Sequence, residues 1–298
     1  MMPGPGVAAP LREGLQQLAA SVPTDVETDT DIQRYRGVAA DRGTTAEALA
    51  VVFELDSTSV TDEITSFRPS GGEPMLRAVF LHGGGLMAGN RFDGVDVLLR
   101  HSDDLDLEVW TVDYPLVPEA RFDTMVSAGV AAVELAAHGG LPIVLVGQSA
   151  GGGLAAAVAF ECRDRGVRLD ALMLVCPMLD ARSTASAAQF DHDPSWSTIS
   201  NATAWKRATE GTATPVPGDR TDVGGVPPVY LDVGSAEVFR DSTVDFAAKL
   251  WADGVSAELH VWSGGFHGFD CAVEDARVSR ESHRARREWL RRWSEGEL

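Results

Sequence analysis

The feature that most constrains the fold of this chain is the pentapeptide GQSAG at residues 147–151. An apolar run at residues 142–146 precedes it, and a helix-compatible stretch of small residues at 152–159 follows it. A strand, a sharp turn and a helix in this order hold the central Ser149 in a strained conformation, with its hydroxyl above a sheet. Both flanking glycines avoid collisions with the neighbouring strand and helix. The pattern predicts Ser149 as a nucleophile; a glycine-rich turn in which Ser149 only caps a helix is the alternative.

Strand-like and helix-like segments alternate along the chain. The β-rich runs lie at residues 50–55, 77–82, 107–113, 141–147, 171–176, 228–233 and 257–262. Helical patterns lie at about 121–137, 149–164, 242–252 and 273–293. Because parallel strands need right-handed crossover connections, this alternation predicts an α/β fold with a doubly wound, mostly parallel sheet. Ligands of such sheets bind at the carboxyl ends of the strands.

Two segments do not fit this alternation. Residues 180–225 are longer than an ordinary loop. Residues 1–45 contain an amphipathic pattern whose apolar residues share one helical face: Leu11, Leu15 and Leu18. We predict that residues 1–45 form an N-terminal cap segment and that residues 46–298 form one α/β catalytic domain with a cap insertion at about 180–225. A mobile tail is the alternative for the N-terminal segment.

A second motif is HGGG at residues 82–85, at the end of a strand-like run. Consecutive glycines let the backbone approach a substrate closely, and amides fixed in place before reaction stabilise a tetrahedral oxyanion by roughly 2.7–4 kcal/mol each. We predict that the amides of Gly84, Gly85 and Ala150 form such an oxyanion hole. His82 is interpreted as a structural residue that holds the loop by hydrogen bonds.

A third motif is GFHGF at residues 265–269, after the last strand-like run. A serine hydroxyl is a weak nucleophile at neutral pH until a neighbouring histidine accepts its proton. The order serine, acid, histidine along the chain is the one expected when the serine lies at a strand–turn–helix nucleophile turn. These considerations predict His267 as the general base.

The HGGG motif, the segment VDYPLVPE at residues 112–119, GQSAGG at 147–152 and FHGF at 266–269 together resemble the hormone-sensitive-lipase family, particularly its bacterial carboxylesterases. The resemblance covers roughly residues 76–270. It implies an α/β-hydrolase fold, a helical cap, no cofactor, and hydrolysis of short acyl esters or lactones. The family's glycine donors fall on Gly84 and Gly85, its nucleophile on Ser149 and its base on His267.

The triad acid follows less directly from the resemblance. The family's acid stands in a D-P-L-R-D-like segment, which aligns here with EVFRD at residues 237–241. This alignment puts Glu237 on the catalytic position, and a glutamate can orient an imidazole as an aspartate does. Asp241 and Asp232 remain alternatives. Gln148 replaces the aspartate that commonly precedes the serine, which leaves the triad intact but alters the support of the surrounding loops.

Composition limits the partners. A formal net charge of −19 argues against binding to nucleic acid or an anionic membrane surface. The three cysteines have no metal-ligand spacing, so we expect buried thiols and no metal. The basic stretch at residues 277–292 is interpreted as the solvated face of a last helix. No apolar run reaches the roughly 20 residues that span a bilayer, and the first residues lack a secretory pattern. We therefore expect a cytoplasmic protein without membrane insertion.

The sequence thus predicts a serine esterase that acts through an acyl-enzyme intermediate on a small-molecule ester or lactone. An amidase or lactone hydrolase would use the same residues, so these remain alternatives. A ligand-binding relative without catalysis is a third interpretation, disfavoured by the presence of both Ser149 and His267. A homodimer is left open because some relatives of the family are dimers.

Overall fold

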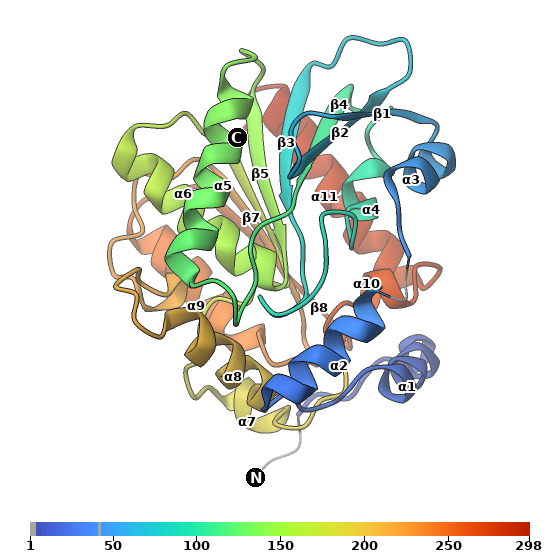
Figure 1. Ribbon diagram of the computed structural model, residues 1–298, viewed down its shortest axis with the longest axis vertical. Coiled ribbons are helices and arrows are strands. Elements are labelled where there is room, and N and C mark those ends of the chain that lie inside the picture. Colours follow the sequence, from blue (N-terminus) through green and yellow to red (C-terminus); the bar gives the residue numbers. More distant parts are fainter. Residues whose placement is uncertain (1–3, 41–42) are drawn as a thin grey trace.

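The centre of the structure is an eight-stranded sheet with helices on both faces (Figure 1). The computed structural model describes residues 4–40 and 43–298. The strand order is β1-β2-β4-β3-β5-β6-β7-β8. The strands are β1 (Leu55–Ser59), β2 (Ile64–Pro69), β3 (Leu76–Leu81), β4 (Leu107–Val112), β5 (Ile143–Gln148), β6 (Ala171–Val175), β7 (Val229–Gly234) and β8 (Ala257–Trp262). Strands β3 to β8 run parallel, and the pairs β1–β2 and β2–β4 are antiparallel. The predicted doubly wound, mostly parallel sheet is confirmed.

The start of the sheet differs from the prediction. The prediction of a strand at residues 50–55 is wrong, because most of these residues belong to helix α3 (Ala46–Phe53). Thr45 caps this helix, since its side chain accepts a hydrogen bond from the amide of Ala48. The strands β1 and β2 follow instead. Strand β1 was missed because four of its five residues are exposed and polar at the sheet edge, which leaves no apolar period to recognise.

Side chains that alternate along the strands build two apolar layers. One layer packs beneath helices α5 (Phe122–Ala137), α6 (Ala150–Arg165) and α9 (Arg240–Ala252). The other packs beneath α3, α4 (Asp96–Leu99) and α11 (Arg277–Ser294). In β3, for example, Val79 faces the first layer and Phe80 the second, as the two-residue period of a strand requires.

The predicted last helix, at residues 273–293, is α11 (Arg277–Ser294) and begins four residues later than predicted. Residues 273–276 separate a short helix, α10 (Phe269–Ala272), from α11. The basic stretch on α11 is solvated at Arg277, Arg280 and Arg284, as predicted. Arg286 is an exception that corrects the prediction: its side chain is only 2% exposed, because two buried carboxylates face it.

Helices α1 (Arg12–Ser21), α2 (Asp29–Ala40), α7 (Ala185–Gln189) and α8 (Thr198–Thr209) gather at the carboxyl edge of the parallel strands, at the bottom of Figure 1. They come from the two segments outside the strand–helix alternation, which also contain the short helices η1 (Ala9–Leu11) and η2 (Pro217–Asp219). Leu11 is fully buried against Phe266 and Phe269, and Leu15 and Leu18 pack against the same cluster. The amphipathic face predicted from the sequence therefore makes tertiary contacts beside the His267 loop.

Candidate active site

Ser149 lies at the turn between β5 and α6, with φ 56° and ψ −118°. A non-glycine residue with positive φ in this region is strained and persists only where its surroundings hold it. A Cβ atom at Gly147 would collide with the carbonyl of Gly151, and a Cβ atom at Gly151 would collide with the carbonyl of Leu81. The turn therefore needs both glycines, for the reason expected from the sequence.

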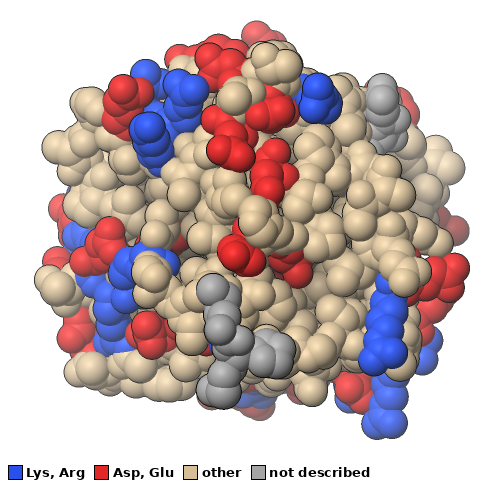
Figure 2. All heavy atoms as spheres, turned by 90° about the horizontal axis from the view of Figure 1, so that it is seen from below, with Lys and Arg blue, Asp and Glu red and all other residues tan. Residues whose placement is uncertain are grey.

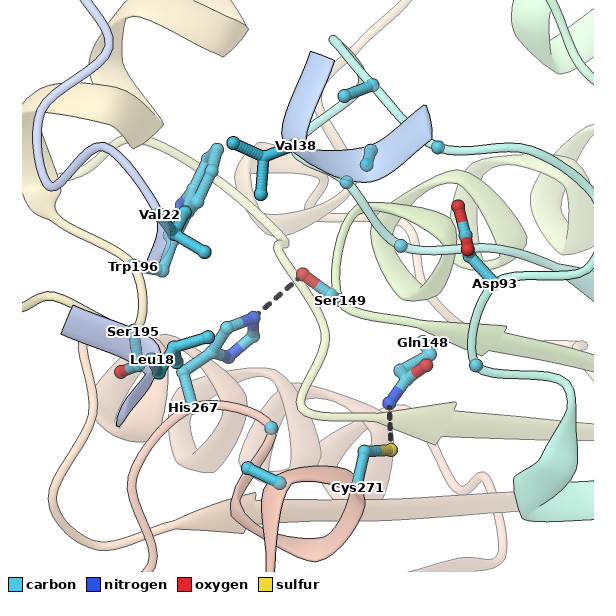
Figure 3. Close-up of a pocket in the computed structure, with 18 of the residues that line it drawn as sticks. Leu18, Val22, Val38, Asp93, Gln148, Ser149, Ser195, Trp196, His267 and Cys271 are labelled. Atoms are coloured by element: carbon cyan, nitrogen blue, oxygen red, sulfur yellow. Dashed lines mark hydrogen bonds between the residues drawn. The ribbon is translucent and has the colours of Figure 1, made fainter. Parts of the chain in front are cut away.

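The structure brings Ser149, His267 and Glu237 into one hydrogen-bonded row. The Oγ atom of Ser149 lies 2.8 Å from Nε2 of His267, as Figure 3 shows. On the other side of the ring, Nδ1 of His267 lies 2.6 Å from Oε2 of Glu237. The second carboxylate oxygen, Oε1, accepts a hydrogen bond of 2.7 Å from the amide of Gly234. A carboxylate, an imidazole and a hydroxyl in this order can move a proton from the hydroxyl to the ring.

The two other candidate acids lie elsewhere. Asp241 accepts hydrogen bonds of 2.7 Å from the amide of Ser186 and from Nε of Arg240. Asp232 is buried on β7 and pairs with Arg286. Of the three carboxylates considered from the sequence, Glu237 is the one placed against the imidazole.

Burial sets the electrostatics of this row. Glu237 is only 1% exposed. Burial raises the pKa of its carboxyl above the ordinary value, while the neighbouring His267 and the Gly234 amide oppose that shift. The hydrogen bonds from His267 and Gly234 therefore favour the ionised form of Glu237, which burial disfavours.

The HGGG loop lies beside Ser149. Gly84 and Gly85 have φ of 108° and 64°, a region that favours glycine. A Cβ atom on Gly84 would collide with the carbonyl of Ala88, and one on Gly85 would collide with the ring of Trp196. Within residues 4–40 and 43–298, no acceptor takes a hydrogen bond from the amides of Gly84, Gly85 or Ala150. These three donors are therefore free for a ligand.

His82 stabilises the conformation of this loop. Its Nδ1 lies 2.6 Å from the carbonyl of Gly83, and its ring stacks on that of Tyr114 with centroids 4.3 Å apart. The hydroxyl of Tyr114 donates to the carbonyl of His82 at 2.8 Å. Burial lowers the pKa of His82, so its ring is neutral and suited to the structural role predicted from the sequence.

Ser149 and His267 line a cavity of about 450 Å³. On one side, Figure 3 shows the apolar side chains Leu18, Val22 and Val38 from the N-terminal helices and Trp196 from the insertion. On the other side lie Asp93, Gln148 and Cys271. Asp96 and Glu274 also line the pocket, and both pair with Arg100, at 2.8 and 3.4 Å. The pocket therefore has one apolar and one polar wall.

Gln148 belongs to the polar wall. Its Nε2 atom lies 3.2 Å from Sγ of Cys271, so it links the nucleophile turn to α10. Cys162 and Cys176 are buried, as predicted, whereas Cys271 is half-buried and lines the pocket. The sequence indicated that the N-terminal segment forms a cap. It did not indicate which residues of that segment line the pocket.

In the part of the chain that the structure describes, no cluster of three or more His, Cys, Asp or Glu side chains could hold a metal ion. Across the same residues, no helix combines the length and the apolar character that a membrane span requires. Seen from the side of α1, α2, α7 and α8, acidic side chains lie along the middle of the face and basic ones toward its edges (Figure 2).

Comparisons with known proteins agree with this geometry. Residues 78–271 match a family model described as "alpha/beta hydrolase fold". The chain is 31% identical over 228 residues to the carboxylic ester hydrolase LipN of Mycobacterium tuberculosis, covering 68% of this chain and 59% of LipN. It is 31% identical over 126 residues to the hormone-sensitive lipase of Mus musculus, covering 39% of this chain and 17% of that one. The crystal structure of esterase LipW from Mycobacterium marinum matches with a TM-score of 0.82 at 26% identity, over 96% of this chain and 97% of that one.

A parallel sheet with a strained serine at a strand–helix turn defines an α/β hydrolase. The chain belongs to the α/β-hydrolase fold family, and the resemblance to hormone-sensitive lipase and the bacterial esterases is confirmed. The chain spans 59–66% of the length of the first curated relatives that it matches.

Proposed function

We propose that this protein is a serine carboxylesterase that hydrolyses small-molecule esters through an acyl-enzyme intermediate. Ser149 attacks the ester carbonyl while Nε2 of His267 takes its proton, and the resulting imidazolium then protonates the leaving alcohol. Water, activated by the same imidazole, hydrolyses the acyl-enzyme. Glu237 holds the Nδ1 proton and stabilises the imidazolium. The observation that carries this proposal is the row Ser149–His267–Glu237, with distances of 2.8 and 2.6 Å, in which Ser149 and His267 line the pocket.

The amides of Gly84, Gly85 and Ala150 are proposed as the oxyanion hole. They have no acceptor among the described residues, and they lie on the two turns that flank the Ser149 hydroxyl. Because their directions are fixed by the fold, they stabilise the developing oxyanion without reorganisation during the reaction. The mechanism assigns no role to a cofactor or a metal.

Replacement of Ser149 tests the proposal directly. Ser149→Ala should remain folded and lose activity toward p-nitrophenyl esters by several orders of magnitude, because the covalent route is removed. Ser102→Ala is a matched control, since Ser102 is also buried and its Oγ has no hydrogen-bond partner in the described structure. Full activity in a folded Ser149→Ala protein would refute the assignment.

The N-terminal helices and the insertion are proposed to act together as a cap. Leu18, Val38 and Trp196 come from the two segments but line one cavity with Ser149. An apolar wall of this kind confines an acyl chain and keeps water from it. Short acyl groups are proposed as the substrates, because the resemblance to the hormone-sensitive-lipase family implies them.

Arg36 on α2 fastens this cap to the loops that follow β3 and β4. Its guanidinium donates two hydrogen bonds, of 2.8 and 2.6 Å, to the carboxylate of Glu119. It also donates to the carbonyls of Met87 and Val117, at 2.7 and 2.6 Å. Met87 follows the HGGG loop, and its amide bonds back to the carbonyl of Gly84. The hydrogen bond from Arg36 lowers the pKa of Glu119 to about 2, so the carboxylate stays charged.

Three alternatives remain testable with one substrate panel. A lactone hydrolase or an amidase would use the same row of side chains, so comparison of esters, lactones and amides at equal acyl length separates them. A ligand-binding protein without catalysis would bind esters but not turn them over. Cytoplasmic location and a homodimer stay predictions; fractionation of cells and sedimentation of the purified protein test them.

A further inference from the structure

A guanidinium is buried behind the His267 loop, between two carboxylates that the proposed mechanism does not use. Arg286 reaches this place from α11. Its Nε and Nη2 atoms lie 2.7 and 3.1 Å from the two oxygens of Asp232, and its Nη1 donates a short hydrogen bond to Oδ2 of Asp270. The side chains of Arg286, Asp232 and Asp270 are only 2%, 1% and 2% exposed.

We propose that Arg286 is a positioning residue that holds the acid-bearing and base-bearing loops of the active site at their working separation. The inference rests on the proposed esterase function. Asp232 lies on β7, whose last residue, Gly234, donates to Glu237. Asp270 lies on α10, three residues beyond His267. Arg286 thus joins the two loops that meet at the bond between Glu237 and His267.

Further hydrogen bonds connect the Arg286 cluster to the same two loops. The indole Nε1 of Trp262, the last residue of β8, lies 3.3 Å from Oδ2 of Asp232. The carbonyl of Trp262 accepts from the amides of Ser235 and Gly265, at 2.8 and 3.1 Å. These amides begin the loops that carry Glu237 and His267. A shift of the Arg286 cluster would therefore move both loops.

The charges of this cluster are explained better by a positioning role than by a contribution to the stability of the fold. A buried ion pair gains little over a well-packed apolar cluster, because both charges lose their water. Here one guanidinium faces two buried carboxylates. Burial favours protonation of Asp270, but the opposing charge of Arg286 lowers the pKa of its carboxyl below the ordinary value, so the bond is charged. A bidentate arrangement of this kind fixes the directions of the hydrogen bonds between the guanidinium and the carboxylates.

The chain contains a matched control. Arg77 and Glu108 form another buried pair, with Nε of Arg77 2.7 Å from Oε2 of Glu108 and side chains 10% and 11% exposed. Arg77 lies near the beginning of β3, at the opposite end of that strand from the HGGG loop, and does not line the pocket. Loss of this pair should weaken the fold without moving the active-site loops.

The experiment compares Arg286→Met with Arg77→Met. Both variants should have a lower Tm. Arg286→Met should lower kcat about tenfold to a hundredfold with little change in KM, since a small displacement of a catalytic group costs rate more than binding. It should also shift or broaden the downfield NMR resonance of the His267 Nδ1 proton. Arg77→Met should keep the wild-type kcat and this resonance.

Two milder variants keep the test decisive if Arg286→Met does not fold. Arg286→Lys retains a charge and should restore part of kcat, whereas Asp270→Asn should lower kcat and perturb the resonance with the rest of the cluster present. Wild-type kcat and an unchanged resonance in every folded Arg286 or Asp270 variant would overturn the inference. The proposed function fails separately, if Ser149→Ala retains activity.

Discussion

Replacement of Glu237 by glutamine has an outcome that can be worked out from two hydrogen bonds. The amide of Gly234 can only donate, so the side-chain oxygen of the introduced glutamine must stay on that side, where Oε1 of Glu237 now accepts at 2.7 Å. The NH₂ group then takes the place of Oε2, 2.6 Å from Nδ1 of His267. Two donors cannot face each other, so Nδ1 becomes an acceptor. The ring proton moves to Nε2, which faces Ser149 and can no longer accept its proton.

The expected loss is large. An amide in place of the orienting carboxylate lowers kcat by about 10⁴, which corresponds to about 5.4 kcal/mol at about 1.36 kcal/mol per tenfold. The assay is the hydrolysis of a p-nitrophenyl ester, with circular dichroism to show that the variant is folded. Asp241→Asn is the control: it keeps an acceptor for Ser186 and should retain activity within about tenfold, as expected for a residue outside the site. A larger loss in Asp241→Asn than in Glu237→Gln would refute the reasoning.

The same variant should change the pH dependence of stability. The folded pKa of Glu237 is raised, so its contribution to stability is present below the ordinary pKa of 4.5 and is lost as pH rises through the folded value. Glutamine does not ionise. The Tm of Glu237→Gln minus that of the wild type should therefore be greater at neutral pH than at acidic pH. A difference that falls as pH rises would contradict the assigned burial.

Three further predictions follow from other parts of the molecule. Arg36→Ala should alter the acyl-chain-length profile of ester hydrolysis by loosening the cap, whereas Arg34→Ala, on the same helix with a side chain 68% exposed, should not; equal profiles would argue against the cap. Burial lowers the pKa of His101 to about 3 and of His283 to about 4, so their stabilising effect is complete above 6.5 and is lost as pH falls toward these values. The free energy of unfolding, measured with denaturant, should therefore fall with decreasing pH by up to about 1.4 kcal/mol per pH unit for each histidine. This fall should be less steep in His283→Gln. Neutral esters should be cleaved faster than matched anionic ones, because Asp93 lines the pocket without an ion-pair partner among the described residues, whereas Asp96 and Glu274 pair with Arg100. Equal kcat/KM for both would contradict this.

The sequence predicts most of the site because each motif constrains the backbone locally. GQSAG needs a strand, a turn and a helix, and its glycines are where a Cβ atom would collide. Glu237 could be found only by aligning the segment with the family's acid motif, since three carboxylates were available near the end of β7. The structure separates them by their partners: Arg286 for Asp232, the Ser186 amide for Asp241, and the imidazole for Glu237.

What the sequence does not predict depends on contacts between distant segments. Nothing local distinguishes Arg286 from the solvated arginines of α11, because its burial results from Asp232 and Asp270 on other elements. Arg36 likewise acquires its role from Glu119, which lies 83 residues away in the chain. The edge strand β1 lacks an apolar period, and the run after Thr45 is apolar enough to suggest a strand although a capped helix forms there. Tertiary contacts override local propensity at such places.

The central claim is that Ser149 is the nucleophile, and covalent labelling tests it most directly. A fluorophosphonate reacts with a serine that is activated by a neighbouring imidazole, and mass spectrometry of the digested protein locates the adduct. We predict a single adduct on the peptide that contains Ser149, with loss of esterase activity in proportion to labelling, and no adduct in Ser149→Ala. Labelling at another residue, or inactivation without an adduct on Ser149, would contradict the account.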